Sequence, residues 1–266
     1  MSRLHVGDID LHLVEDGRGM PVLLVHGFPL DHSMWQPQID GLKGEFRIIA
    51  PDLRGFGQSG VTSGTVTMEQ FADDLAALLD ALKIQEPIVF CGLSMGGYIA
   101  WQFWRRHAQR LRALVLCDTR AVADTEEAAR GRVSTAQQVV TAGLSSLAES
   151  MIPKLFAEPT RTERKDVVEA TRRVILSSPP EGIAAALRGM AARPDVTKEL
   201  PEIKVPTLVV CGEHDVISPV AEMRKIATAI PHASFEVIPQ AGHMCPIENS
   251  SVFNAALRKF LESLCS

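Results

Sequence analysis

The 266-residue chain has no hydrophobic run long enough to cross a membrane. Its longest apolar stretches, such as Val22–Val25 and Thr207–Cys211, have the length of strands, whereas a membrane helix needs about 20 apolar residues. The N-terminal residues Met1–Asp8 lack the apolar core of a signal peptide. We therefore expect a cytoplasmic protein that has no membrane partner.

The chain also lacks an excess of basic residues and any regular cysteine pattern. Its 27 Lys and Arg residues against 32 Asp and Glu residues give a net charge of −5, which argues against nucleic acid as a partner. The five cysteines are odd in number and none has C-x-x-C spacing, so neither a disulfide framework nor a zinc site is expected. With 46% hydrophobic and 22% charged residues, the composition excludes a disordered chain, a fibrous repeat and a coiled coil.

What the sequence does contain is a series of short runs rich in Val, Ile and Leu. Continuous apolar strands are typical of a parallel sheet that is covered on both faces. Residues 4–15 alternate between apolar and polar instead, which predicts an antiparallel edge hairpin. Stripes at helical spacing within 68–82 and 252–264 predict helices between the strands, and this alternation predicts an open, mostly parallel α/β sheet. The expected strands lie at 22–25, 47–50, 88–91, 113–116, 207–211 and 235–238.

The alternation of predicted strands and helices is interrupted between residues 120 and 200. This stretch has several helical patterns, no convincing strand, and prolines that interrupt it. We interpret residues 120–200 as a helical cap and residues 1–119 and 201–266 as the core domain.

The chemistry is indicated first by the segment Gly92-Leu93-Ser94-Met95-Gly96-Gly97, which directly follows the predicted strand at 88–91. It has the form G-x-S-x-G, the nucleophile elbow, in which a serine lies on a strained turn between a strand and a helix. A side chain at position 92 or 96 would crowd the neighbouring backbone, so glycine is needed there. Ser94 is therefore the predicted nucleophile.

A serine hydroxyl needs a base to take its proton, and that base needs an acid to orient it. Among eight histidines, His243 follows the strand at 235–238, at the sheet edge where such folds build sites. Asp215 follows the strand at 207–211, and the order Ser94, Asp215, His243 is the one expected of a fold with this elbow. Asp118, which follows the strand at 113–116, is the competing acid and is less favoured.

The oxyanion of the reaction intermediate needs two hydrogen-bond donors. One predicted donor is the N–H of Met95, the residue after the nucleophile. The other is the N–H of Phe28 in His26-Gly27-Phe28-Pro29, the loop that follows the strand at 22–25. We expect His26 to make a structural hydrogen bond beneath this loop.

These motifs resemble those of the α/β-hydrolase superfamily, and the resemblance covers almost the whole chain. Within the superfamily, the sequence is most similar to bacterial carboxylesterases, 3-oxoadipate enol-lactonases and cofactor-free haloperoxidases, which act as perhydrolases. The resemblance implies an eight-stranded sheet with a helical cap, and it implies the same roles for Ser94, Asp215, His243, Phe28 and Met95. The segments that carry it are His26–Pro29, the elbow, Pro51–Ser59, Gly212–Asp215 and Ala241–His243.

Differences from other members of the superfamily also indicate which reactions are not expected. Epoxide hydrolases and haloalkane dehalogenases place an aspartate at the elbow, where this chain has Ser94. The enol-lactonases tend to have Asn-Thr-Ala after the strand before the cap, where this chain has Asp118-Thr119-Arg120.

The sequence thus predicts a serine hydrolase that cleaves small carboxylic esters through an acyl-enzyme and needs no metal or organic cofactor. Enol-lactone hydrolysis, or peracid formation with hydrogen peroxide, would use the same residues; a non-catalytic ligand-binding protein is the remaining alternative. Phe28, Trp35 and Met95 are expected to line an apolar substrate pocket. Arg120, near the expected cap entrance, is interpreted as solvated or salt-bridged. Homo-oligomer formation stays open.

Overall fold

A computed structural model describes residues 2–265, which are built around one eight-stranded sheet with the strand order β1-β2-β4-β3-β5-β6-β7-β8. β1 pairs with β2, and β2 with β4, in antiparallel fashion, and every other neighbouring pair is parallel. The predicted α/β fold with a mostly parallel sheet is confirmed. The strands are β1 (Ser2–Val6), β2 (Ile9–Asp16), β3 (Pro21–Val25), β4 (Arg47–Pro51), β5 (Ile88–Leu93), β6 (Leu111–Cys117), β7 (Thr207–Gly212) and β8 (Ser234–Ile238).

The edge hairpin predicted from residues 4–15 is formed by β1 and β2, with Leu4 opposite Leu11. Leu11 and Leu13 are fully buried, whereas the first residues of β1 are exposed. The alternation in the sequence therefore reports a strand with one face on the core.

Helices cover both faces of the sheet and create two separate apolar clusters. On one face, α3 packs against β5 and β6, α2 against α3 and β1, and α9 against β7 and β8. On the other face, α1 and α11 pack against each other and the sheet. The stripes predicted at 68–82 and 252–264 correspond to α2 and α11. The bounds are α1 (Gln36–Leu42), α2 (Met68–Ala81), α3 (Met95–His107), α9 (Val220–Ala229), α10 (Cys245–Glu248) and α11 (Ser250–Ser263), with 3₁₀ turns at His32–Trp35, Ala108–Arg110 and Thr197–Glu202.

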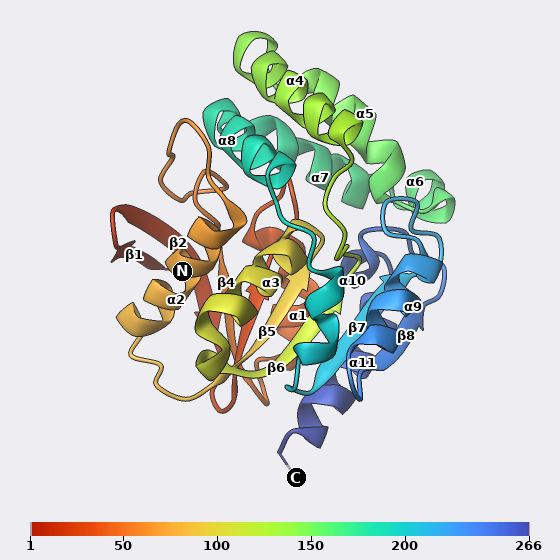
Figure 1. Cartoon of the computed structure of the whole chain (residues 1–266). Coiled ribbons are helices and arrows are strands. Elements are labelled where there is room, and N and C mark those ends of the chain that lie inside the picture. The colour runs from red at the N-terminus through yellow and green to blue at the C-terminus, as the bar shows by residue number, and fades with distance from the viewer. Residues whose placement is uncertain (1, 266) are drawn as a thin grey trace.

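Five further helices lie between β6 and β7 in the sequence and gather at one end of the molecule, at the top of Figure 1. A backbone hydrogen bond joins these helices to the loop before α2: the N–H of Val66 donates to the carbonyl oxygen of Ala185 in α8 (3.2 Å). An ion pair of 2.8 Å between Asp124 and Arg193 joins the two ends of this insertion. That these helices form a separate cap domain, residues 120–200, stays a prediction. They are α4 (Glu126–Ala142), α5 (Ser145–Leu155), α6 (Glu158–Glu163), α7 (Lys165–Ser177) and α8 (Pro180–Ala191).

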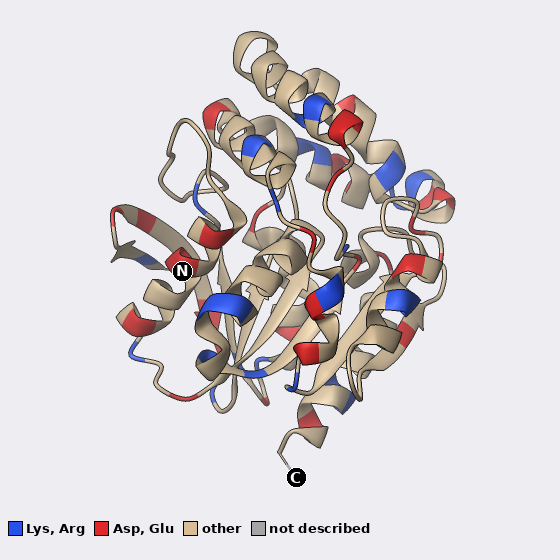
Figure 2. Ribbon diagram, viewed as in Figure 1, with Lys and Arg blue, Asp and Glu red and all other residues tan. Residues whose placement is uncertain are grey.

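Charged residues of both signs are interspersed over the outer helices and loops (Figure 2). None of the helices within residues 2–265 combines the length and the apolar composition that a bilayer crossing requires.

Candidate active site

Ser94 lies between the end of β5 and the start of α3, with a φ of +53°. This backbone conformation is strained for a residue with a side chain, and it is the geometry of a nucleophile elbow. The turn is held by the N–H of Ser94, which donates to the carbonyl of Cys117 (2.9 Å), and by the hydroxyl of Thr119, which donates to the carbonyl of Ser94 (2.8 Å). A Cβ atom at Gly92 would overlap the carbonyl of Gly96, and one at Gly96 would overlap a backbone oxygen of β3. The predicted need for both glycines is confirmed.

His243 and Asp215 meet at the same edge of the sheet. The Nδ1 atom of His243 lies 2.8 Å from Oδ2 of Asp215, and both side chains are buried. The other carboxylate oxygen of Asp215 accepts the N–H of Ile217 (2.7 Å). Burial by itself raises the pKa of Asp215, but the charge and hydrogen bond of His243 and the backbone N–H groups of Ser218 and Ile217 outweigh it and lower that pKa. Asp215 is thus an ionised partner that holds the proton of His243 on Nδ1.

Asp118 lies beside this pair and has a different environment. Its Oδ1 accepts the N–H of Gly212 (2.8 Å) and its Oδ2 accepts the thiol of Cys245 (2.9 Å). Complete burial, followed by the negative charge of Asp215, raises the pKa of Asp118 well above its ordinary value. The hydrogen bonds of Asp118 thus go to Gly212 and Cys245, and it is Asp215 that contacts His243.

The loop after β3 lies directly against the elbow. A Cβ atom on Gly27 would lie 3.4 Å from Cβ of Ser94, and the N–H of Leu30 closes the turn by donating to the carbonyl of Gly27 (3.0 Å). Within residues 2–265, neither the N–H of Phe28 nor that of Met95 has a recorded hydrogen-bond partner. Among the same residues, no hydrogen bond joins the Ser94 hydroxyl to His243, a contact that often tightens only when substrate is bound.

The chain matches the family model of the alpha/beta hydrolase fold over residues 20–250. It belongs to the α/β-hydrolase superfamily. A 3-oxoadipate enol-lactonase from Acinetobacter baylyi is 32% identical over 234 residues, which cover 88% of this chain and 85% of that enzyme. A thermophilic esterase from Thermogutta terrifontis, solved with malate bound, has a TM-score of 0.99 and 47% identity over the whole of both chains. An enol-lactonase from Burkholderia xenovorans has a TM-score of 0.91 and 33% identity, covering 98% of this chain and 100% of that one. The predicted enzyme class, a carboxylic ester hydrolase, is supported by these relatives.

The residues predicted to line the substrate pocket of this α/β-hydrolase differ in their placement. Phe28 is 7% exposed and lies edge-on to Phe56, with ring centroids 6.2 Å apart. The side chains of Met95 and Trp35 are fully buried, and Trp35 packs against Phe253 on the face covered by α1 and α11. That Phe28, Trp35 and Met95 line a substrate pocket stays a prediction.

Two other predicted residues have structural partners. His26 is fully buried; its Nδ1 lies 2.9 Å from the carbonyl of Gly27, and its Nε2 accepts the N–H of Leu53 (3.0 Å). These bonds confirm its structural role beneath the loop. Arg120 makes a two-point ion pair with Glu222 (2.9 and 3.0 Å), as the salt-bridged interpretation expects.

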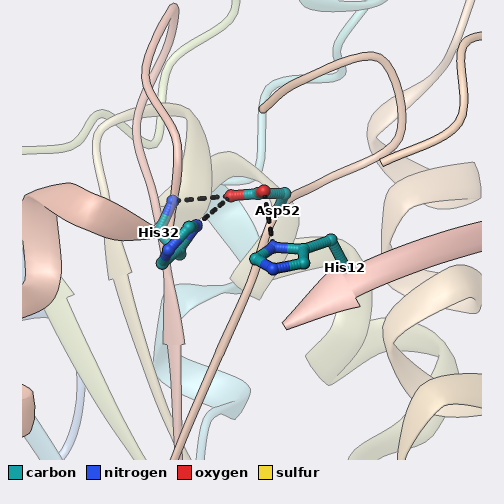
Figure 3. Close-up of side chains that lie close together, drawn as sticks. All are labelled: His12, His32 and Asp52. Carbon is teal, nitrogen blue, oxygen red and sulfur yellow. Dashed lines mark hydrogen bonds and ion pairs between the residues drawn. The ribbon is translucent and has the colours of Figure 1, made fainter. Parts of the chain in front are cut away.

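A buried cluster next to the Phe28 loop was not found by sequence reasoning. Asp52, at the end of β4, contacts Nδ1 of His12 (2.9 Å) and Nδ1 of His32 (2.6 Å), as Figure 3 shows. These are hydrogen-bond distances, so both imidazoles are paired with the one carboxylate. Burial raises the pKa of Asp52, but His32 and the N–H groups of Gln58 and His32 lower it to about 2. The cluster ties β2, the loop after β3 and the loop after β4 together, and only Asp52 itself lies in a motif that the sequence analysis singled out.

Proposed function

We propose that this protein is a serine hydrolase of small carboxylic esters that works through an acyl-enzyme. The observation that carries the proposal is the buried hydrogen bond of 2.8 Å between His243 and Asp215, at the sheet edge where Ser94 lies on its strained turn. Nδ1 of His243 is committed to Asp215, so its Nε2 is the atom available to take the Ser94 proton. Ser94 then attacks the ester carbonyl, His243 returns the proton to the leaving alcohol, and water activated by His243 releases the acid.

The tetrahedral intermediate is stabilised in this proposal by the N–H groups of Phe28 and Met95. Two observations support these donors: both N–H groups lack a partner within the described residues, and the Gly27 backbone lies against Ser94. Because the donors belong to two backbone segments that are already fixed, they need no reorganisation when charge develops on the oxygen.

Esters and enol-lactones are the two substrate classes that the relatives favour. An esterase is 47% identical to this chain, and an enol-lactonase with the same fold is 33% identical. An enol-lactone is an internal ester, so the same attack opens its ring. We propose simple esters as the main class because the closer of these two relatives is an esterase.

The decisive experiment is reaction with a fluorophosphonate, followed by mass spectrometry of the peptides. We expect one adduct, on the peptide that contains Ser94, and none in the Ser94→Ala variant. That variant should lose about 10⁴-fold or more of its turnover of a p-nitrophenyl ester, as should His243→Ala, and the double variant should be little worse. Ser150→Ala, which removes an exposed hydroxyl in α5, is the matched control.

Labelling at another serine, with esterase activity surviving in Ser94→Ala, would falsify the proposal. A panel of p-nitrophenyl esters of graded chain length together with one enol-lactone separates the two substrate classes.

A further inference from the structure

Glu248, at the end of α10, holds both sides of the loop that carries His243. Its Oε1 accepts the N–H of Gly242 (2.8 Å) and the N–H of Met244 (3.2 Å), the residues directly before and after the histidine. The side chain is buried, with 8% of the residue exposed. Two backbone groups that flank one imidazole are thus bound to one carboxylate oxygen, which limits the rotation of the Ala241–Gly242 and His243–Met244 peptide units.

The second oxygen of the same carboxylate reaches the helical insertion. Oε2 of Glu248 accepts the N–H of Ala157, which lies between α5 and α6 (2.8 Å). Two further bonds join the same parts: the N–H of Met244 donates to the carbonyl of Leu155 (3.0 Å), and Arg164 donates to the backbone carbonyl of Glu248 (2.8 Å). Residues 155–164 and the His243 loop are therefore held as one unit.

The space around this carboxylate is filled. A Cβ atom on Gly242 would lie 2.7 Å from the backbone nitrogen of Ala157 and 3.2 Å from Oε1 of Glu248. The two backbone segments approach so closely that no other side chain could enter between them. Removing the carboxylate would leave the buried N–H groups of Gly242 and Ala157 without an acceptor, which is costly, and would take from the N–H of Met244 one of its two acceptors, the other being the carbonyl of Leu155.

We propose that Glu248 is a positioning residue that fixes the imidazole of His243 relative to Ser94 and couples its position to that of the α5–α6 segment. The inference rests on the proposed function, because it takes His243 as the catalytic base. A displacement of about 1 Å in a catalytic group can lower turnover by about 10²-fold, so small movements of this loop matter for rate.

Replacing Glu248 by glutamine breaks its bonds either to Ala157 or to the loop that carries His243, but not both. A glutamine has one acceptor oxygen and one N–H₂ donor, whereas Glu248 uses both oxygens as acceptors. Whichever way the amide lies, its N–H₂ faces a backbone N–H, so either the Ala157 side or the His243 side loses its bond. Glu248→Ala removes both sides.

The experiment compares Glu248→Gln, Glu248→Ala and Glu213→Ala in steady-state kinetics and in amide hydrogen exchange. Glu213 is the matched control, because it is an exposed glutamate that accepts the N–H of Gln240 in the same loop (3.0 Å). We expect kcat to fall about tenfold in Glu248→Gln and about 10²-fold in Glu248→Ala, with KM little changed, because substrate contacts are untouched. Exchange at Gly242, Met244 and Ala157 should rise together in Glu248→Ala. Glu213→Ala should keep kcat within about twofold, because an exposed contact contributes little.

Folded Glu248 variants that keep kcat at the level of Glu213→Ala would overturn the inference. So would a rise in KM at constant kcat, which is the mark of lost substrate binding. If Glu248→Ala does not fold, Glu248→Gln decides the kinetics and the exchange. A wild-type protein that is not labelled at Ser94 would refute the proposed function separately. Hydrogen exchange at the amides of Gly242, Met244 and Ala157 then still tests the contacts of Glu248, because this measurement requires no turnover.

Discussion

Replacing Asp52 by asparagine tests whether the buried cluster beside the Phe28 loop stabilises the fold. The carboxylate accepts four hydrogen bonds, from the ring and the backbone N–H of His32, from the ring of His12 and from the backbone N–H of Gln58. In Asp52→Asn, one oxygen becomes an N–H₂ group. Because each oxygen also accepts a backbone N–H, which cannot change its protonation, two donors then face each other in the core.

The size of the effect follows from the pKa and from the lost bond. The fall in the pKa of Asp52 from 3.8 to about 2 corresponds to about 2 kcal/mol of folding free energy at neutral pH. An unpaired buried donor adds about 1–3 kcal/mol. We therefore expect Asp52→Asn to lower the free energy of unfolding by about 3–5 kcal/mol.

The contribution of this cluster to folding stability should decrease both at low pH and at high pH. The pKa of Asp52 is lowered on folding, so its contribution is present above about pH 4 and is lost as pH falls towards 2. The pKa of His32 is raised by Asp52 against the effect of burial, so that contribution is complete below pH 6.5 and is lost as pH rises through the folded-state value. The stability gap between wild type and Asp52→Asn should be widest between about pH 4 and 6.5.

Urea unfolding at about pH 3, 5.5 and 8 measures this gap. Asp10→Asn is the control, because Asp10 makes the same contact with a histidine, His5 at 2.9 Å, but on the exposed edge of the sheet. Its effect should stay below about 1 kcal/mol. A gap for Asp52→Asn as small as that of Asp10→Asn, or one that does not narrow towards pH 3, would refute the reasoning.

Two further substitutions test the site and the elbow. Asp215→Asn should lower kcat about 10⁴-fold because it spoils the orientation of the base, whereas Asp118→Asn should cost far less, because the hydrogen bonds of Asp118 go to Gly212 and Cys245; the reverse order in a kinetic assay would assign the acid to the earlier strand. Gly96→Ala should destabilise the protein by several kcal/mol (about 3 or more) or prevent folding, because its Cβ would overlap a backbone oxygen of β3. Gly131→Ala in α4, where a Cβ meets nothing within 4 Å, should instead stabilise it by about 0.5–1 kcal/mol, and thermal unfolding compares the two.

The strands, the mostly parallel class of the sheet and the elbow could all be predicted from the sequence. These features are local: a continuous apolar run signals a strand buried on both faces, and the glycines around Ser94 are required by their own neighbours along the chain and in the next strand. The placement of His243 and Asp215 was also predictable, since the carboxyl ends of parallel strands share one edge of the sheet.

The contacts that distinguish the two candidate acids are visible only in the folded protein. Asp118 and Asp215 both follow strands that end at that edge, and one residue pattern fits both. Their difference arises from contacts between distant segments: Asp215 accepts from His243, whereas Asp118 accepts from Gly212 and Cys245.

Contacts between distant segments also explain two features that the sequence did not predict. Trp35 lies in the core because α11, more than 200 residues later, packs on it, and Glu248 binds Ala157 because the insertion folds back over the His243 loop. A sequence pattern reports which face of an element is apolar, but burial, protonation and hydrogen-bond partners depend on which distant groups the fold brings within about 3 Å, and that is decided by packing in three dimensions.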